Sequence, residues 1–359
     1  MKGILYLEDG SIYEGKGFGK KGTAVGELVF NTSITGYQEI LTDPSYAGEI
    51  ITMTYPLIGN YGVNAVENES SKIYAKGFIV KSIDKNPSNY MSEFTIAEML
   101  EKMGVVGIYD VDTRSITKKI RNKGALKCVI SNEEQSIDQL KAILMQSAVK
   151  DDWMKNVSTK KVMHIPGKGP KIALIDFGVK ANIINHLKYR NCDVTIFPYD
   201  AGYEEIMNIK PDGLLLSNGP GNPKAATEAI ETVKKLMYQI PTFGICMGHQ
   251  ILALAVGGDT YKMKYGHRGG NHGVYDIEKD RAYITSQNHG YAVDPKSLEE
   301  KGMMITHVNL NDETVEGMKH KELPIFSVQF HPEGAPGPTD SAYLFDNYIG
   351  LLKGEKTWL

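Results

Sequence analysis

The second half of the chain limits the possible folds most, because short apolar runs alternate there with helical periodicity. Apolar runs cover residues 171–178, 194–197 and 213–216, and a helical pattern covers residues 181–187. Short apolar runs between helices are typical of parallel strands that are buried on both faces. The alternation predicts a mainly parallel sheet flanked by helices, with a functional site at the carboxyl ends of the strands.

A cysteine stands between two glycines in the segment 241–252, which reads PTFGICMGHQIL. An apolar run ends at Gly244 and a helical pattern starts after Cys246, so the segment predicts a strand, a sharp turn and a helix. The glycines remove Cβ clashes at such a strained turn, and the helix dipole favours a thiolate at its start. Cys246 is therefore a candidate nucleophile, although a small buried residue in a tight turn would show the same pattern.

A candidate base follows a short β-like run at residues 324–330, which leads into His331-Pro332-Glu333. Proline stops the strand and keeps the histidine extended. The carboxylate two residues further on can fix the imidazole tautomer and stabilise an imidazolium. A single histidine at a strand end is commonly a surface residue, but beside a cysteine turn it is a candidate general base.

These motifs resemble those of class I glutamine amidotransferases. Cys246 in Gly-Ile-Cys-Met-Gly-His-Gln, and His331 with Glu333 in Gln-Phe-His-Pro-Glu, match the Cys-His-Glu triad of that family, and a third motif agrees at residues 214–223. The resemblance implies that this third segment lies over the nucleophile and supplies a backbone N–H to an oxyanion hole. Glycine suits that role, because it lets the main chain approach an oxyanion.

The same resemblance implies contacts with the substrate, L-glutamine. The segment 287–294 resembles the loop that holds the α-amino and α-carboxylate groups, although its residues are also compatible with an ordinary turn. Gln250 and Ser45 match family positions that contact glutamine. The implied glutamine-binding residues are Ser45, Gly219, Gly221, Met247, Gln250, Asn288, Gly290 and Tyr291.

The first half of the chain has a different pattern. Residues 1 to about 90 show short β-like runs between turn residues, and helical patterns follow, of which the first has a capping box at Thr95 and Glu98. The block at residues 26–62 reads as a strand and then polar loops, which are typical of solvated connections. Together with the segments 112–114 and 123–125, this block is similar to the N-terminal domain of carbamoyl-phosphate synthase small subunits.

Two domains are expected, because 359 residues suffice for two cores. The resemblance implies a smaller β-rich α+β domain at residues 1–150 and an α/β class I glutamine amidotransferase domain at residues 171–359. Residues 151–170 are polar and lack periodicity, which predicts a linker.

Composition excludes several classes of function. The formal net charge is −3, and Lys and Arg are scattered, which argues against nucleic acid as a partner. No apolar run has the length of a membrane span, and an early acidic residue argues against a signal peptide, so we expect a cytoplasmic protein without membrane contact. Cys128, Cys192 and Cys246 show no metal-binding spacing, and a glycine-rich loop explains His267 and His272 better than a metal does. We expect no metal.

The resemblance implies the glutamine-hydrolysing subunit of a carbamoyl-phosphate synthase. Such a subunit releases ammonia through a thioester and passes it to a large-subunit partner that makes carbamoyl phosphate from bicarbonate and ATP. The chain lacks a phosphate-binding Gly-Lys-Ser/Thr loop, so we expect no cofactor here, with ATP and Mg²⁺ on the large subunit. The loops of the first half are the candidate docking surface.

Three alternatives stay open at this point: another class I amidotransferase, a free-standing γ-glutamyl hydrolase, and a regulatory or scaffold subunit without activity. The sequence leaves open whether the product would serve arginine or pyrimidine synthesis, how many heterodimers assemble and which effectors act.

Overall fold

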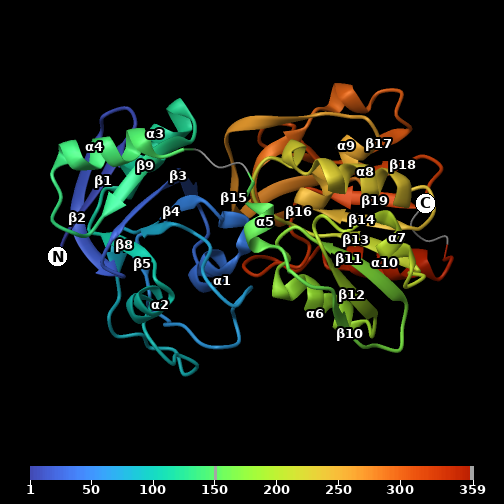
Figure 1. Cartoon of the computed structure of the whole chain (residues 1–359), viewed down its shortest axis with the longest axis horizontal. Helices are drawn as coiled ribbons and strands as arrows, with labels where there is room; N and C mark the ends of the chain where they lie inside the picture. The colour runs from blue at the N-terminus through green and yellow to red at the C-terminus, as the bar shows by residue number, and fades with distance from the viewer. Residues whose placement is uncertain (149–151, 356–359) are drawn as a thin grey trace. The chain divides into compact units, whose positions relative to one another are not determined.

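The chain forms two compact units, Met1–Lys150 and Asp151–Leu359. The computed structural model describes residues 1–148 and 152–355 (Figure 1). The predicted domain boundary at residues 150 and 151, and residues 356–359 of the predicted second domain, lie outside the described residues.

The first unit is built on a closed barrel in the order β1-β2-β8-β6-β4-β3-β9. Its wall combines antiparallel pairs, such as β1 with β2 and with β9, with a parallel run from β3 through β4 and β6 to β8. Apolar side chains such as Val29, Ile51 and Phe78 are buried in its core. The barrel strands are β1 (Lys2–Leu7), β2 (Ile12–Gly19), β3 (Thr23–Asn31), β4 (Glu49–Met53), β6 (Gly77–Ile79), β8 (Val106–Tyr109) and β9 (Leu126–Ser131), and a separate small sheet pairs β5 (Leu57–Ile58) with β7 (Ser82–Ile83).

Three helices of the first unit, α2 (Ile96–Met103), α3 (Thr113–Lys123) and α4 (Ile137–Gln146), start at residues whose side chains cap them. The Thr95 side chain accepts from the Glu98 N–H and the Glu98 carboxylate accepts from the Thr95 N–H, which confirms the predicted capping box.

The prediction of solvated polar loops after β3 is wrong in part, because the block at residues 26–62 contains a short helix and a 3₁₀ turn. Its polar side chains are buried with internal partners, as when Gln38 donates to the Asn64 carbonyl. The helices are α1 (Tyr37–Thr42), η1 (Pro44–Tyr46), α2 (Ile96–Met103), α3 (Thr113–Lys123) and α4 (Ile137–Gln146).

The second unit contains a sheet in the order β10-β12-β11-β13-β14-β19-β18-β17-β15-β16. The five neighbouring strands β12, β11, β13, β14 and β19 are parallel, as predicted. Strand β10 at one edge, and β18, β17, β15 and β16 beyond β19, pair antiparallel. The strands are β10 (Met163–Ile165), β11 (Lys171–Asp176), β12 (Asp193–Pro198), β13 (Gly213–Leu216), β14 (Thr242–Ile245), β15 (Thr260–Asp276), β16 (Arg281–Val293), β17 (Met303–Asn309), β18 (Val315–His320) and β19 (Ile325–Val328).

Helices cover both faces of the parallel strands, because side chains of successive strand residues point to opposite faces. Ala173 and Ile175 of β11 pack in one core with α7, α8 and α9, and Ile172 and Leu174 pack in another with α6 and α10. Both faces are therefore apolar, as the continuous apolar runs predicted. The helices are α5 (Met154–Val157), α6 (Ala181–Tyr189), α7 (Tyr203–Met207), η2 (Pro223–Ala225), α8 (Thr227–Leu236), α9 (Met247–Ala255), η3 (Pro295–Leu298) and α10 (Tyr343–Leu352).

Two predictions for this unit differ from the structure. The linker expected at residues 151–170 contains α5 and β10, and β10 pairs with β12, so most of it belongs to the second unit. The glycine-rich loop expected around His267 and His272 lies within the long strand β15, and residues 287–291 lie within β16. Bulges account for this result, since β15 shifts register twice against β16 around its glycines.

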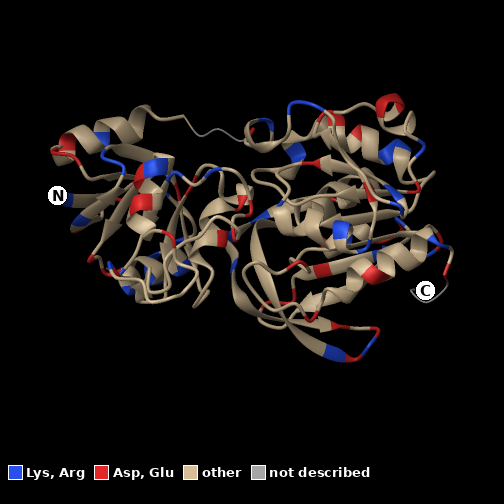
Figure 2. Cartoon of the chain, turned by 90° about the horizontal axis from the view of Figure 1, so that it is seen from below, with Lys and Arg blue, Asp and Glu red and all other residues tan. Residues whose placement is uncertain are grey.

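Lys and Arg residues are interspersed with Asp and Glu residues along the ribbon of each unit (Figure 2). This distribution agrees with the scattered charges in the sequence. None of the described helices is both long enough and apolar enough to cross a membrane.

Candidate active site

Cys246 lies at the sharp turn between β14 and α9. Its φ is 53° and its ψ is −102°, a conformation that is strained for a residue with a side chain. The flanking glycines are sterically required: a Cβ on Gly244 would lie 2.8 Å from the backbone of Gly248, and a Cβ on Gly248 would lie 2.2 Å from the Leu216 carbonyl oxygen. The predicted strand, turn and helix are thus present, and two glycines allow the close packing.

His331 and Glu333 follow β19, which is next to β14 in the sheet. Nδ1 of His331 lies 2.6 Å from Oε1 of Glu333, and both side chains are buried. The backbone N–H of His331 donates to the Ser286 carbonyl at 2.9 Å, which connects this segment to β16. Because a carboxylate only accepts, Nδ1 carries the proton of this hydrogen bond, and Nε2 is the nitrogen available for proton transfer.

Lys180 and Asn182 also hold Glu333, and sequence reasoning missed both. Lys180 Nζ lies 2.9 Å from Oε1 of Glu333 and donates to the Gly334 carbonyl at 2.6 Å, while the Asn182 amide donates to the Glu333 carbonyl at 2.8 Å. The side chain of Lys180 is only 3% exposed. Its one signal in the sequence is its place at the start of α6, shortly after the carboxyl end of β11.

These contacts shift the pKa values of the buried pair in opposite directions. Burial disfavours charge on Glu333, but Lys180 and His331 outweigh it and lower the Glu333 pKa to about 2. Burial also disfavours charge on His331, but Glu333 and Cys246 outweigh it and raise the His331 pKa to about 10. The favoured state is therefore a carboxylate beside an imidazolium.

The thiol of Cys246 is close enough to His331 to contribute to that pKa. The thiol and His331 Nε2 do not form a hydrogen bond of normal geometry. His331 Nε2 has no hydrogen-bond partner, and Cys246 Sγ donates instead to the Asn288 carbonyl at 3.6 Å. Catalytic hydrogen bonds are often loose before substrate binds. The structure brings Cys246, His331 and Glu333 together, as the sequence predicted.

The loop after β13 lies beside the cysteine turn. The Gly248 N–H donates to the Ser217 carbonyl at 2.9 Å, which ties the start of α9 to this loop. A Cβ on Gly219 would lie 2.3 Å from the Phe177 carbonyl oxygen, and Gly221 has a φ of 89°, so both positions favour glycine.

The candidate substrate residues of β16 also lie near Cys246. The Asn288 carbonyl accepts from the cysteine thiol, and Gly290 and Tyr291 follow on the same strand. Gln250 is buried on α9, and its amide nitrogen donates to the Tyr291 carbonyl at 2.9 Å and to Gln329 Oε1 at 3.0 Å. Gln250 therefore holds the β16 segment.

Ser45 belongs to the first unit, where it is buried in η1 and its N–H donates to Asp43 Oδ1 at 2.9 Å. Its predicted contact with glutamine stays a prediction.

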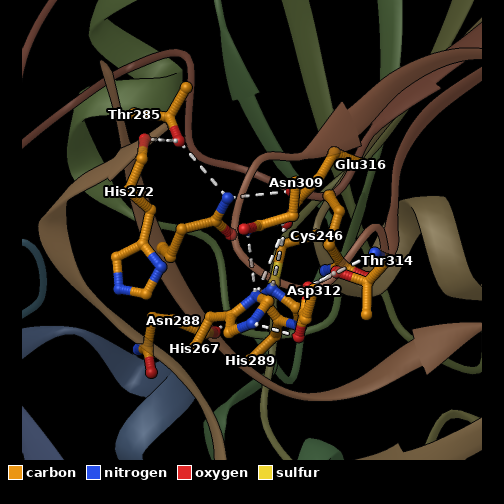
Figure 3. A network of polar contacts seen from close by, with 12 residues as sticks. Cys246, His267, His272, Thr285, Asn288, His289, Asn309, Asp312, Thr314 and Glu316 are labelled. Carbon is orange, nitrogen blue, oxygen red and sulfur yellow. Dashed lines mark hydrogen bonds and ion pairs between the residues drawn. The ribbon is translucent and has the colours of Figure 1, made fainter. Parts of the chain in front are cut away.

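A polar network that is buried except for Asp312 was missed in the sequence. It joins His267 of β15, His289 of β16 and Glu316 of β18, together with Gln287, Asn309 and Asp312 (Figure 3). The sequence hides it, because its members are spread over 50 residues and only strand pairing, with His267 opposite His289, brings them together.

The arrangement supplies the parts that acyl transfer requires: a thiol at a strained turn, an imidazole oriented by a carboxylate, and glycine-rich backbone next to them. No member of this group requires a metal for these roles.

Comparison with known proteins agrees with this arrangement. The second unit matches the family model "Glutamine amidotransferase class-I" over residues 173–351, and the first unit matches "Carbamoyl-phosphate synthase small chain, CPSase domain" over residues 5–130. The carbamoyl phosphate synthase small chain of Clostridium acetobutylicum is 67% identical, with 98% of this chain and 100% of that protein covered.

Two further relatives extend the comparison. The small chain of Fusobacterium nucleatum is 49% identical, with 96% of each chain covered. The pyrimidine-specific small chain of Bacillus subtilis is 46% identical, with 98% of this chain and 96% of that protein covered. Since both units match along almost their whole length, the chain belongs to the carbamoyl-phosphate synthase small chain family and contains a class I glutamine amidotransferase domain.

Proposed function

We propose that this chain hydrolyses L-glutamine for a carbamoyl-phosphate synthase, with Cys246 as nucleophile, His331 as acid and base, and Glu333 as the group that orients His331. The observation that carries the proposal is the placement of Cys246 at a strained turn beside a buried His331–Glu333 pair. Family membership supplies the substrate and the setting.

In the first half of the reaction, His331 Nε2 takes the proton of the Cys246 thiol, and the resulting thiolate attacks the side-chain amide carbon of glutamine. A C–S bond forms, and the electron pair of the carbonyl moves to oxygen. His331 then gives its Nε2 proton to the amide nitrogen, the C–N bond breaks and ammonia leaves a thioester.

In the second half, His331 takes a proton from water, which attacks the thioester carbon. The C–S bond breaks and glutamate leaves. Glu333 stays ionised throughout, because Lys180 and His331 stabilise its negative charge. The N–H groups of Gly221 and Met247 stabilise the oxyanion in both halves; their positions after β13 and at the start of α9 suit this role.

Asn288, Gly290 and Tyr291 hold the α-amino and α-carboxylate groups of glutamine in this proposal. Gln250 supports them through its bond to the Tyr291 carbonyl, and Gly219 shapes the loop above the thiol. Ser45 is included because of its match to the family position.

The released ammonia passes to a large subunit that carries ATP, Mg²⁺ and the bicarbonate chemistry, and glutamine hydrolysis in this chain uses no cofactor. The two proteins form a heterodimer in the cytoplasm. One relative is named pyrimidine-specific, which makes pyrimidine synthesis one candidate pathway for this chain, beside arginine synthesis.

The test is glutamate release from glutamine by the purified chain, with and without a carbamoyl-phosphate synthase large subunit, bicarbonate and ATP. We expect weak activity alone and a strong increase with the partner. Cys246→Ser should lower both rates at least about a thousandfold, because serine is a far weaker nucleophile at this turn. Full activity alone that ignores the partner would instead indicate a free-standing hydrolase.

A further inference from the structure

We propose that His267, His289 and Glu316 form a binding site for one divalent transition-metal ion, with Zn²⁺ as the best-suited ion. The three residues come from β15, β16 and β18, and their ligand atoms all lie within 4.8 Å of one another. The reaction proposed above assigns these three residues no role, although His289 lies on the same strand segment as Asn288 and Gly290.

The inner nitrogen of each histidine faces the same carboxylate oxygen, and the inner nitrogen of His267 also lies 3.4 Å from the Asn309 amide nitrogen. Nδ1 of His267 lies 3.5 Å from Oε1 of Glu316, and Nε2 of His289 lies 4.0 Å from the same atom. Zn²⁺ binds imidazole nitrogen and carboxylate oxygen at about 2.0–2.2 Å, which places tetrahedral ligands roughly 3.3 Å apart. Small movements of these side chains would therefore bring the three ligand atoms to the spacing that a bound Zn²⁺ requires.

The outer nitrogen of each ring is fixed in the way that metal-binding histidines require. Nε2 of His267 lies 2.9 Å from Oδ2 of Asp312, and Nδ1 of His289 lies 2.8 Å from the Tyr291 carbonyl oxygen. A carboxylate and a carbonyl only accept, so the outer nitrogens carry the protons, which leaves lone pairs on the inner nitrogens of neutral rings. Histidine ligands in metal sites typically have this support.

His289 supplies an independent indication of a missing partner. Its side chain is 2% exposed, and its Nε2 has no hydrogen-bond partner, although it is directed toward the Glu316 carboxylate (Figure 3). Buried polar atoms are nearly always paired, and a cation between His289 Nε2 and the Glu316 carboxylate would supply the partner that His289 lacks. The other oxygen of Glu316 accepts from Gln287 at 2.8 Å, so the carboxylate is held in place.

A proton is the rival occupant of this site. Burial disfavours charge on His267, but hydrogen bonds to Asp312 and Glu316 outweigh it and raise the His267 pKa to about 9. A protonated His267 would satisfy Glu316 without an ion, as the Asn309 amide also does at 2.8 Å. This alternative does not satisfy His289, and the experiment below separates the two occupants.

The experiment is a titration of the full-length chain with Zn²⁺, followed by calorimetry. Cys246→Ser is used as the parent, because the thiol and His331 could otherwise bind the ion. We expect one Zn²⁺ per chain. Glu316→Gln and His267→Gln should each weaken binding at least about a hundredfold, since each removes a direct ligand.

His272→Gln is the matched control. The ring of His272 is centred 5.2 Å from that of His267 but His272 is not one of the three proposed ligands, so this variant should bind Zn²⁺ like the parent. Failure of the parent to bind Zn²⁺, or equal binding by Glu316→Gln and His267→Gln, overturns the proposal and leaves the proton as the occupant.

A second measurement tests the proposal without ligand substitutions, in case those variants do not fold. X-ray absorption at the zinc edge of the Cys246→Ser protein should show two imidazole ligands and a carboxylate oxygen. A spectrum with one imidazole or none places the ion elsewhere and also overturns the proposal.

Discussion

Lys180 keeps the buried Glu333 of the candidate site in its charged form, which the triad alone would do less well. Glu333 is fully buried between His331 and Lys180, and buried carboxylates without cationic partners tend to become neutral. A neutral Glu333 would stabilise the imidazolium form of His331 less. The ammonium group thus acts on the reaction through Glu333 and His331, and we regard Lys180 as a positioning residue.

We predict that Lys180→Met lowers the rate of glutamate release mainly through kcat, with a smaller change in KM. The variant should also lose about 3 kcal/mol of unfolding free energy, because it leaves one charge of a buried pair without its partner. Steady-state kinetics and urea unfolding measure the two effects.

The double variant Lys180→Met/Glu333→Gln is the control for this prediction. It removes both charges, so it should regain most of the lost stability while its activity stays low. If the single variant kept full kcat, the role assigned to Lys180 would be wrong.

The turn from β14 into α9 is an element whose geometry depends on glycines. Gly244 and Gly248 allow the backbone of the turn, the helix and β13 to approach within distances that a Cβ would prevent. The helix is thereby held at the position from which Met247 can face the substrate in the proposed reaction. Rigid elements of this kind fix a reactive group better than a loop does.

Gly248→Ala should disturb this turn strongly. The new Cβ would lie 2.2 Å from the Leu216 carbonyl oxygen, so the start of α9 must move. We expect a loss of about 1–3 kcal/mol in unfolding free energy and at least about a tenfold loss of glutamate release.

Gly202→Ala serves as the comparison, since a Cβ there would meet nothing within 4 Å. Its activity and its urea midpoint should stay close to those of the unchanged protein. Equal effects of the two substitutions would show that the turn is not sterically limited.

The sequence predicted correctly those elements whose signals lie in neighbouring residues. The strand, turn and helix around Cys246 and the capping box at Thr95 each depend on neighbouring residues, so they could be predicted. The buried role of Lys180 and the pairing of His267 with His289 depend on contacts between distant segments, which no local pattern encodes. Family resemblance supplied the rest of the candidate site, apart from Lys180 and the histidine network.

At the scale of the whole molecule, each unit has its own core, so each can respond separately to solution conditions. The buried His331–Glu333 pair links the stability of the second unit to pH. A raised pKa for His331 stabilises the folded unit fully below its unfolded value of about 6.5, and this contribution is lost as pH rises toward about 10. The lowered pKa of Glu333 contributes above its unfolded value of 4.5, and this contribution is lost as pH falls toward about 2.

We therefore predict that the unfolding free energy of the second unit decreases between pH 7 and pH 10 more in the unchanged protein than in His331→Gln. Urea unfolding across this range, followed by a probe in the second unit, measures the difference. Parallel pH profiles of the two proteins would contradict the assigned pKa of His331.

The closed barrel of the first unit also limits the order of events during protein synthesis. Strand β1 pairs with β2 on one side and with β9 on the other, so β1 waits during synthesis for Leu126–Ser131 before both of its edges are covered. Contacts between such distant segments form slowly, and uncovered strand edges invite association with other chains. A nascent chain that stalls before β9 would therefore be a natural substrate for chaperones, whereas one that has passed it can close its barrel while the second unit is still being translated.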